Sequence, residues 1–545
     1  MSWTLPAIPE ADDTPLVRQL LAIIRAQQER LQQLEAEIAR LKGLKTRPVI
    51  APSRLETTPR QPSAPGRKRP GSDKRSKTAQ LTITTEDVIP LVDKPPGSTS
   101  KGYEDFVVQD LVIEPRVILY RRERWQTPDG QTLVAPLPRE VLPGSHFGPN
   151  LICFIVHQYH HQHVTQPLLW EQLDQWGIDI SMGQLSRILT EQKDSFHHEK
   201  DQFLPAALEV SPYVQVDDTG ARHKGRNGYC TQIGNDLFAS FESTNSKSRL
   251  NFLELLRRPH TDYVINEIAV GYWDEQKLAA AVVEKLCQGP CQFRDATEWH
   301  ARLQELGITA ERHVRIAGEG ALLGSLIAHG VSTELGILSD GAGQFKVLVH
   351  IACWIHAERP LTRMVPYSDE HRAAIEKVRQ QIWELYQDLK AYRLEPTAAQ
   401  RPILEARFDE LCAHRTDFPS VDAVLKGMSD NRADLLRVLE RPEVPLHNNL
   451  SEGHMRDYVK KRKISGSTRS EAGRRARDTF ASLKKTCRRL GVNFWAYLQD
   501  RVRGCARIPP LAELIRQKGE ETWPGKGSTR VGRAEGISVA SPEGA

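Results

Sequence analysis

The central part of the chain alternates short strand-like runs with helical stretches, and this alternation limits the possible folds most. A helical stretch at Leu250–Arg257 follows three successive strand-like runs, and a fourth run precedes a long helical region at 368–440. This order predicts an α/β domain that carries a helical insertion. The expected strands are Tyr213–Asp217, Gly228–Ile233, Leu237–Phe241 and Leu335–Leu338.

Two of these strands end in a carboxylate close to a glycine. Asp217 stands in VDDTG, and Asp340 stands in LSDGAG. A carboxylate at a strand end is exposed at the edge of a sheet, where a ligand can approach. Two such groups on adjacent strands repel each other unless a cation lies between them, and Mg²⁺ prefers oxygen ligands of this kind. A pair of turn aspartates is the alternative, because Asp-Gly is a common turn dipeptide.

A third acid, Glu452, opens a strongly basic segment. With Asn449 as N-cap, Glu452 would complete a capping box and could pair with Arg456 one turn later. Residues 456–489 carry 13 basic and three acidic side chains, which makes this segment the best candidate surface for nucleic acid. Its candidate DNA-binding residues are Arg456, Lys460, Lys461, Arg462, Lys463, Arg474 and Arg475.

Residues 15–42 carry a heptad repeat over four heptads. Val17, Ile24, Leu31 and Ile38 form one row of the apolar seam. This spacing is typical of a leucine-zipper coiled coil, so we expect the chain to self-associate here. An amphipathic helix packed on its own chain is the alternative.

The next segment, 43–80, has ten basic residues among prolines, serines and threonines. We expect a disordered linker whose basic clusters contact DNA phosphates without sequence specificity. One such cluster is formed by Arg67, Lys68 and Arg69. The strand-like runs of 81–148 predict a small β-rich module. The last residues, 518–545, are expected to be disordered.

Residues 149–195 are expected to be helical. Ser181 with Gln184 three residues later predicts a capping box on the second of two short helices. The pair fits a helix-turn-helix that contacts DNA, or a purely structural helix pair. The histidine run at 157–163 favours a packed or solvated helix over a metal site, because no acid or cysteine stands nearby.

Composition excludes several classes of protein. The net charge of +5 over 545 residues excludes a histone-like basic chain, so any surface for nucleic acid must be local. Eight scattered cysteines fit a reducing cytoplasm better than a disulfide framework. No apolar run has the length of a membrane span, and no phosphate-binding loop of the GxxxxGK[ST] type occurs, which disfavours an ATP-dependent helper.

Several motifs in this order resemble the DDE transposases of the insertion sequence 66 family. They are VDDTG, then LSDGAGQF and CWIHAER, then PLHNNLSEGHMR with KKRKISGS, and finally SLKKTCRRLGVNFWAYLQD. The resemblance covers nearly the whole chain from about residue 15 to 505. It implies an RNase H-like catalytic core at 211–505, with insertions at about 262–330 and 366–440.

The resemblance assigns Asp217, Asp340 and Glu452 to the acidic triad of this family. Such a triad would hold two Mg²⁺ ions, about 3.5–4 Å apart in two-metal sites, and Mn²⁺ may substitute. The resemblance also puts His356 and Arg359 close to the core. The candidate residues that support the core are His356, Arg359, Asn448 and Asn449.

The sequence departs from the family pattern at three points. The family's module before the core pairs cysteines for zinc, whereas 81–148 has no cysteine, so we predict no zinc. The 262–330 stretch is an added βα-like insertion. Gly453 follows the glutamate where the family commonly has arginine.

The sequence therefore predicts a cytoplasmic, prokaryotic transposase that acts on nucleoid DNA. It would bind the terminal inverted repeats of its element, cleave them, and join them to target DNA as a homo-oligomer. Accessory proteins of the same element are candidate partners, and a membrane is not. The alternative is a catalytically inactive, transposase-derived protein that binds specific DNA.

Overall fold

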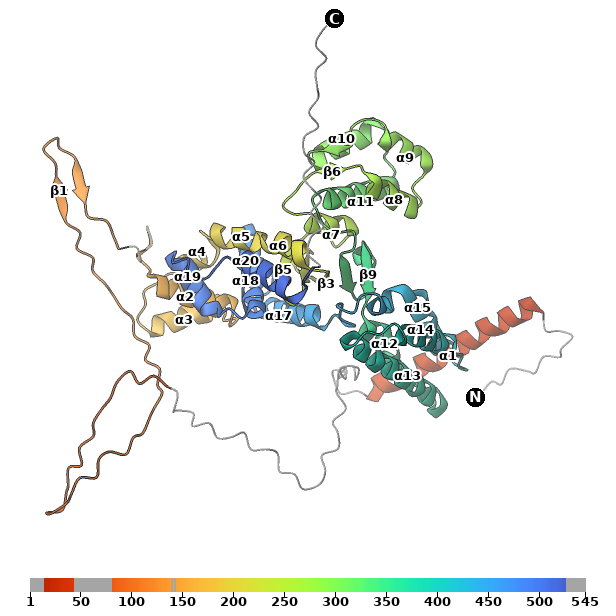
Figure 1. Cartoon of the computed structure of the whole chain (residues 1–545). Helices are drawn as coiled ribbons and strands as arrows, with labels where there is room; N and C mark the ends of the chain where they lie inside the picture. Colours follow the sequence, from red (N-terminus) through yellow and green to blue (C-terminus); the bar gives the residue numbers. More distant parts are fainter. Residues whose placement is uncertain (1–13, 44–80, 139–140, 142–143, 526–545) are drawn as a thin grey trace, which may run out of the picture.

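A five-stranded mixed sheet forms the centre of the protein. The computed structural model describes residues 14–43, 81–138, 141 and 144–525. The order across the sheet is β5-β4-β3-β8-β9. This sheet and the helices around it confirm the predicted α/β class (Figure 1). The strands are β3 (Tyr213–Gly220), β4 (Tyr229–Gly234), β5 (Ala239–Thr244), β8 (Gly336–Ser339) and β9 (Val349–Ala352).

Strand β3 is the middle strand, and the direction of its neighbours differs on its two sides. It pairs antiparallel with β4, with Asp217 opposite Gln232. On the other side it pairs parallel with β8, with Gln215 opposite Leu338. Because β3 and β8 run in the same direction, their carboxyl ends meet at one edge of the sheet.

Helix α18 (Glu471–Leu490) closes the edge of the sheet beside β5. An edge strand presents unpaired backbone N–H groups that must find other acceptors. The N–H groups of Ala239, Phe241 and Ser243 donate to α18 side chains, at 3.1, 2.9 and 2.8 Å. The donors stand two residues apart in the strand, about 6.7 Å, and the acceptors stand four residues apart in the helix, about 6 Å, so the two spacings match. The acceptors are Thr486 Oγ1, Ser482 Oγ and Asp478 Oδ2.

A helical unit packs beside α18 and combines helices that precede the sheet in the chain with two that follow it. Ser181 accepts a bond from the N–H of Gln184, whose side chain accepts one from the Ser181 N–H, so the predicted capping box is confirmed. Leu169, Leu173 and Leu185 bury the turn between the short helices. The unit contains α2 (Pro149–His160), α3 (Gln166–Gln175), α4 (Met182–Thr190), α5 (Asp194–Asp201), α6 (Phe203–Val210), α19 (Phe494–Arg503) and α20 (Leu511–Thr522).

The expected start of a disordered tail at 518 is wrong. Helix α20 continues to Thr522 and packs on α6. Gly519 is buried there, and an added Cβ would lie 2.3 Å from a methyl carbon of Val210. The close approach of two helices therefore orders this part of the chain, whereas residues 526–545 lie outside the described residues.

Two insertions project from the sheet as separate bodies (Figure 1). In the first, at 262–330, helices surround a two-stranded antiparallel sheet and bury Trp273 and Trp299. Its elements, with the helix that leads into it, are α7 (Arg249–Leu256), β6 (Tyr263–Val264), α8 (Glu267–Glu275), α9 (Ala280–Cys287), β7 (Gln292–Phe293), α10 (Ala296–Glu305) and α11 (Glu311–Ala328).

The second insertion lies between β9 and the basic segment. Its longest helix, within the predicted helical region at 368–440, buries an apolar stripe that includes Ile375, Ile382 and Leu389. A short 3-10 turn, η3 (Gly343–Phe345), precedes β9. The other elements are α12 (Trp354–Arg363), α13 (Asp369–Leu394), α14 (Gln400–Ala413), α15 (Pro419–Asp430), α16 (Arg432–Leu435) and η4 (Arg437–Leu439).

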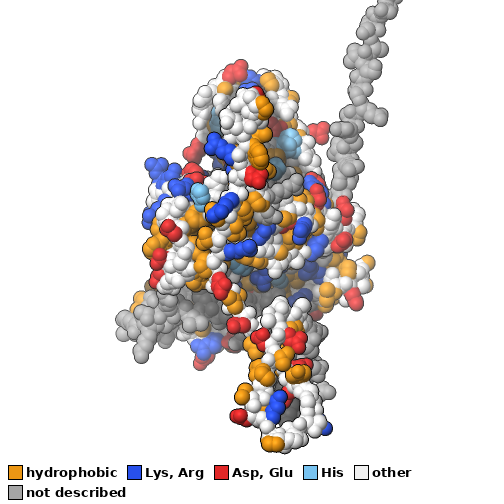
Figure 2. All heavy atoms as spheres, turned by 90° about the vertical axis from the view of Figure 1, so that its left-hand side faces the viewer, with side chains coloured by type: hydrophobic (Ala, Val, Ile, Leu, Met, Phe, Trp, Pro, Cys, Tyr) orange, Lys and Arg blue, Asp and Glu red, His pale blue; other side chains and the backbone are white. Residues whose placement is uncertain are grey.

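The segment before the helical unit has less regular structure than predicted. A single hairpin is present in its described residues, formed by β1 (Arg124–Gln126) and β2 (Thr132–Val134). The other described residues of 81–148 form no strand, so the β-rich module predicted there is not seen. Apolar side chains such as Phe106 and Val117 are exposed, and apolar and charged groups mix along the projecting segment at the bottom of Figure 2.

The predicted zipper forms one helix, α1 (Pro15–Gly43), that lies against α15. Glu29 is buried at this contact and accepts a 3.0 Å bond from the backbone N–H of Ser420. Seam residues Ile24, Leu31 and Ile38 stay exposed in the single chain. In the described part of the protein, no helix is both long and apolar enough to cross a membrane.

Candidate functional site

Three acids from distant parts of the sequence meet at the carboxyl edge of β3 and β8. Asp217 lies in β3, Asp340 directly follows β8, and Glu452 lies in the first turn of α17 (Asn449–Ser465), which packs against β3. Gly341 adopts a φ of 91°, a conformation that suits glycine, and the turn lets Asp340 Oδ1 accept from the N–H of Ala342 at 3.0 Å. The fold thus brings all three predicted acids together.

The electrostatics of this edge disfavour a negative charge on Asp217. Burial, together with the nearby carboxylates of Asp340, Asp218 and Glu452, raises the pKa of Asp217 from 3.8 to about 7. A bond from the N–H of Asp218 to Asp217 Oδ1, at 2.8 Å, opposes this rise. Clustered carboxylates that lack a counter-charge are stabilised when a cation binds between them.

Asp218 has a different partner from Asp217. Its Oδ2 accepts a 2.7 Å bond from Gln344 Nε2 of η3. Burial raises the pKa of Asp218, while Gln344 and Lys247 lower it. Sequence reasoning missed Gln344, although it stands four residues after Asp340 in LSDGAGQF. Its place in that motif was the available signal.

The capping box predicted for Glu452 is wrong. Helix α17 begins at Asn449, so Asn448 is the N-cap, and its side chain makes no capping bond. Instead, Asn448 Nδ2 donates to the carbonyl of Val216 at 2.8 Å, and its N–H donates to Cys353 Sγ at 3.3 Å. Asn448 therefore ties the head of α17 to β3, one residue before Asp217. The N–H of Asn449 donates to His447 Nδ1 at 3.4 Å.

Glu452 lies against two side chains of α12, and one of them, Arg359, donates a hydrogen bond to it. Arg359 Nη2 donates to Glu452 Oε1 at 3.1 Å, and His356 Nε2 lies 3.5 Å from the same oxygen. Arg359 Nη1 also donates to His356 Nε2 at 2.7 Å. Burial lowers the pKa of His356, and the Arg359 guanidinium lowers it further. The structure therefore places both predicted core-supporting residues of α12 against the third acid.

The donor set fits a hard divalent cation, but the side chains are not arranged around one. Carboxylate oxygens are the ligands such a cation prefers, and the raised pKa of Asp217 is the expected response to a missing positive charge. However, no group of three His, Cys, Asp or Glu side chains among the described residues is arranged to hold a metal ion. For Glu452 to bind a metal ion, its ion pair with Arg359 would have to break.

A cavity of about 420 Å³ lies beside the acids, between α12 and α15. Asp340, His356 and Lys346 contribute polar groups to its lining. Apolar residues such as Val424 and Met428 form the wall on α15. Space for a substrate group therefore exists next to Asp340.

The predicted basic residues divide into exposed and engaged groups. Arg456, Lys460 and Lys463 are exposed on α17. Three others make contacts: Arg462 donates to Thr219 Oγ1 at 3.1 Å, Arg474 pairs with Glu471 at 2.7 Å, and Arg475 lies 3.5 Å from Asp201. Arg67, Lys68 and Arg69 lie outside the described residues.

Lys461 differs from its neighbours because it is buried. Its Nζ donates to the carbonyl of Tyr159 at 2.7 Å and lies 3.4 Å from the centre of the Tyr159 ring. Burial, together with the positive charges of Arg477 and Lys484, lowers its pKa from 10.5 to about 7. This contact joins α17 to the helical unit.

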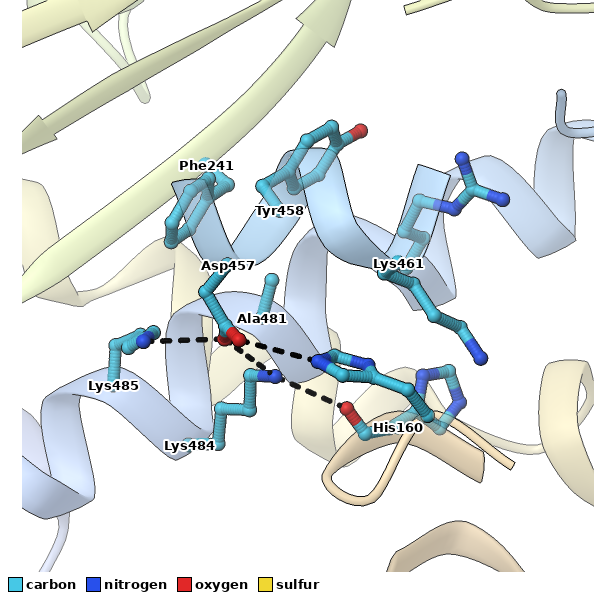
Figure 3. A pocket seen from close by; sticks show the side chains of 10 residues that line it. His160, Phe241, Asp457, Tyr458, Lys461, Ala481, Lys484 and Lys485 are labelled. Carbon is cyan, nitrogen blue, oxygen red and sulfur yellow. Dashed lines mark hydrogen bonds and ion pairs between the residues drawn. The ribbon is translucent and has the colours of Figure 1, made fainter. Parts of the chain in front are cut away.

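Asp457 is the acid at the centre of this junction (Figure 3). Its carboxylate lies 2.9 Å from Lys484 Nζ, 3.1 Å from Lys485 Nζ and 3.2 Å from His163 Nε2. His160 of the histidine run is buried and stacks on Phe480, with ring centroids 4.3 Å apart. The enclosed space is only about 20 Å³, close to the volume of a single water position, so we interpret the cluster as a structural junction.

The sequence was also compared with known proteins. The model of the transposase IS66 family matches residues 337–476, which include Asp340, His356, Arg359 and Glu452. A protein from Sinorhizobium fredii (strain NBRC 101917 / NGR234), described as uncharacterized protein y4jO, is 42% identical over 320 residues. The aligned region covers 58% of this chain and 99% of that protein. No solved structure matches the chain significantly.

Proposed function

Because this chain belongs to the transposase IS66 family, we propose that it is an active DNA transposase whose catalytic acids are Asp217, Asp340 and Glu452. One observation carries the proposal. Three carboxylates from two adjacent parallel strands and a helix converge, and burial with mutual repulsion raises the pKa of Asp217 to about 7. A bound cation would relieve this repulsion.

The proposed cofactor is Mg²⁺, and Mn²⁺ would substitute for it. Asp217, Asp340 and Glu452 would hold the metal through their carboxylate oxygens. Bound there, divalent metal would supply Lewis-acid stabilisation of the charge that develops on a phosphodiester during in-line attack. The strand order β5-β4-β3-β8-β9, with three antiparallel strands and two parallel additions, supports an RNase H-like core.

The chain's own residues would position the acids and the DNA. Asn448 fixes the head of α17 on β3 and so sets the place of Glu452. Gln344 binds the carboxylate of Asp218, and neighbouring residues of a strand point to opposite faces, so Asp217 would be the member of the pair that serves the site. The exposed face of α17, with Arg456, Lys460 and Lys463, would contact the phosphate backbone without reading sequence.

We further propose that α1 pairs two subunits. Its apolar seam is exposed in the single chain, and a coiled coil would bury it. Two joined subunits suit a reaction that must hold two DNA ends together. Accessory proteins of the same element would be further partners.

A cleavage and strand-transfer assay tests the proposal. The substrate is a duplex with the terminal inverted repeats that flank the gene, in Mg²⁺ or Mn²⁺. We expect the parent chain to cut and join this DNA, and Asp217→Asn, Asp340→Asn and Glu452→Gln each to lose product while still binding the duplex. Full activity in the three variants would refute the triad. Binding by the parent without product in either metal would favour the alternative, an inactive transposase-derived DNA-binding protein.

A further inference from the structure

The third acid of the proposed site is already paired with a cation that belongs to the protein. Arg359 Nη2 donates to Glu452 Oε1 at 3.1 Å, and both side chains are less than one third exposed. At Asp217, in contrast, the charged groups that change the pKa most are carboxylates, those of Asp340, Asp218 and Glu452. Glu452 therefore has a cationic partner within the protein, whereas Asp217 lies among other acids.

Local geometry fixes this ion pair. Helix α12 begins at Trp354, directly after β9, so His356 and Arg359 lie three residues apart on one helical face. Arg359 donates to His356 Nε2 at 2.7 Å, so this nitrogen is the acceptor and the ring proton lies on Nδ1. His356 Nδ1 is buried and has no hydrogen-bond partner among the described residues. The neutral imidazole thus orients the guanidinium toward Glu452.

A guanidinium and a divalent cation compete for the same carboxylate. While Arg359 occupies Glu452 Oε1, this acid is not free to complete a metal site, in agreement with the absence of a three-residue metal group among the described residues. A phosphate group is a better partner for the planar fork of arginine, because it can accept two parallel hydrogen bonds. The neighbouring 420 Å³ cavity, lined by His356 and Asp340, leaves room for a backbone segment to approach.

We infer that Arg359 is a positioning residue that keeps Glu452 from the metal until a DNA phosphate takes the guanidinium. This inference rests on the proposed function and adds its regulation. Metal binding and DNA binding are then coupled: DNA removes the internal cation, and Glu452 becomes free to bind metal. The chain alone would bind metal weakly and would leave the site inactive away from DNA.

Mn²⁺ binding to the full-length chain, measured by calorimetry and by electron paramagnetic resonance, tests this coupling. Without DNA, we expect Arg359→Gln to bind Mn²⁺ roughly tenfold more tightly than the parent, because a charged hydrogen bond to Glu452 is lost. A mixed-sequence duplex should tighten Mn²⁺ binding by the parent and have little effect on Arg359→Gln. Arg359→Lys keeps the charge but loses the fork, so it should lie between the two.

Two controls separate the possible failures. Arg363→Gln removes an exposed positive charge from the same helix, and we expect its Mn²⁺ affinity to stay close to that of the parent. Equal affinities of the parent and Arg359→Gln, both lost in Asp217→Asn, would overturn the role of Arg359 and leave the metal site standing. Mn²⁺ binding that survives Asp217→Asn in both backgrounds would show that the proposed metal site is wrong, and the inference would fall with it.

Discussion

Asp457 is expected to be essential for the junction between α17, α18 and the helical unit. It is the acid that Lys484, Lys485 and His163 all contact, at 2.9, 3.1 and 3.2 Å. Burial alone would raise its pKa, but the hydrogen bond from His163 and the two ammonium groups hold the pKa far below its usual range. The folded state therefore strongly favours the ionised carboxylate.

The substitution Asp457→Asn keeps the shape and removes the charge. Lys484 is only 7% exposed, so its ammonium would remain buried without an anion, and Lys485, at 15%, is the less buried of the two. Breaking a buried pair from one side costs about 3–5 kcal/mol. Because the amide oxygen of the introduced side chain could still accept one hydrogen bond, we expect the lower end of that range, about 3 kcal/mol.

Hydrogen–deuterium exchange of the α17 and α18 amides measures this cost as a local opening free energy. The double variant Asp457→Asn/Lys484→Met should recover a large part of the loss, because the most deeply buried ammonium partner of Asp457 is then absent. The pKa of Asp457 is depressed in the folded state, so its contribution is present above about pH 4 and is lost as the pH falls further. A loss below about 1 kcal/mol, or a double variant no more stable than the single one, would refute this reasoning.

Three other predictions concern the buried Lys461, the exposed lysines of α17 and helix α1. The pKa of Lys461 is about 7 in the folded protein and higher in the unfolded chain. The free energy of unfolding should therefore rise by roughly 1.4 kcal/mol per pH unit between pH 7 and 10. Denaturation curves of Lys461→Met should lack this contribution to the pH dependence. Replacing Lys460 and Lys463 by glutamine should make the dependence of log binding constant on log salt concentration less steep, by roughly 0.9 per lost phosphate contact. Lys461→Met should leave this slope unchanged, and the opposite pattern would contradict the burial of Lys461. Deletion of residues 15–43 should give a smaller particle in light scattering, and an unchanged mass would remove α1 from the proposed interface.

The sheet and two of its acids could be predicted because the signal is local. An apolar run that leads to an aspartate close to a glycine predicts a strand with a carboxylate near its end. Asp340 directly follows β8 as expected, whereas β3 continues for three residues beyond Asp217, to Gly220. Parallel pairing of β3 and β8 then brings the two ends together. Here sequence and fold agree because each strand carries its own functional residue.

Other features depend on contacts between distant segments, which a single sequence does not show. The run Lys460–Lys463 looks uniformly basic, yet α2 covers the face of α17 that carries Lys461. The capping box at Glu452 was plausible locally, but the Asn448 side chain bonds to β3 instead. The ladder from α18 to β5 has no local signal at all, because its acceptors lie more than 230 residues away from their donors.

Asp217 and Asp340 are proposed to hold a divalent metal together with Glu452. Crystals of the full chain with a duplex of its terminal repeats, grown in MnCl₂, would test it through the anomalous scattering of manganese. We predict an anomalous peak between the Asp217 and Asp340 carboxylates, with Glu452 turned away from Arg359. A map with no peak at these acids, or with manganese bound only elsewhere on the protein, would contradict the claim.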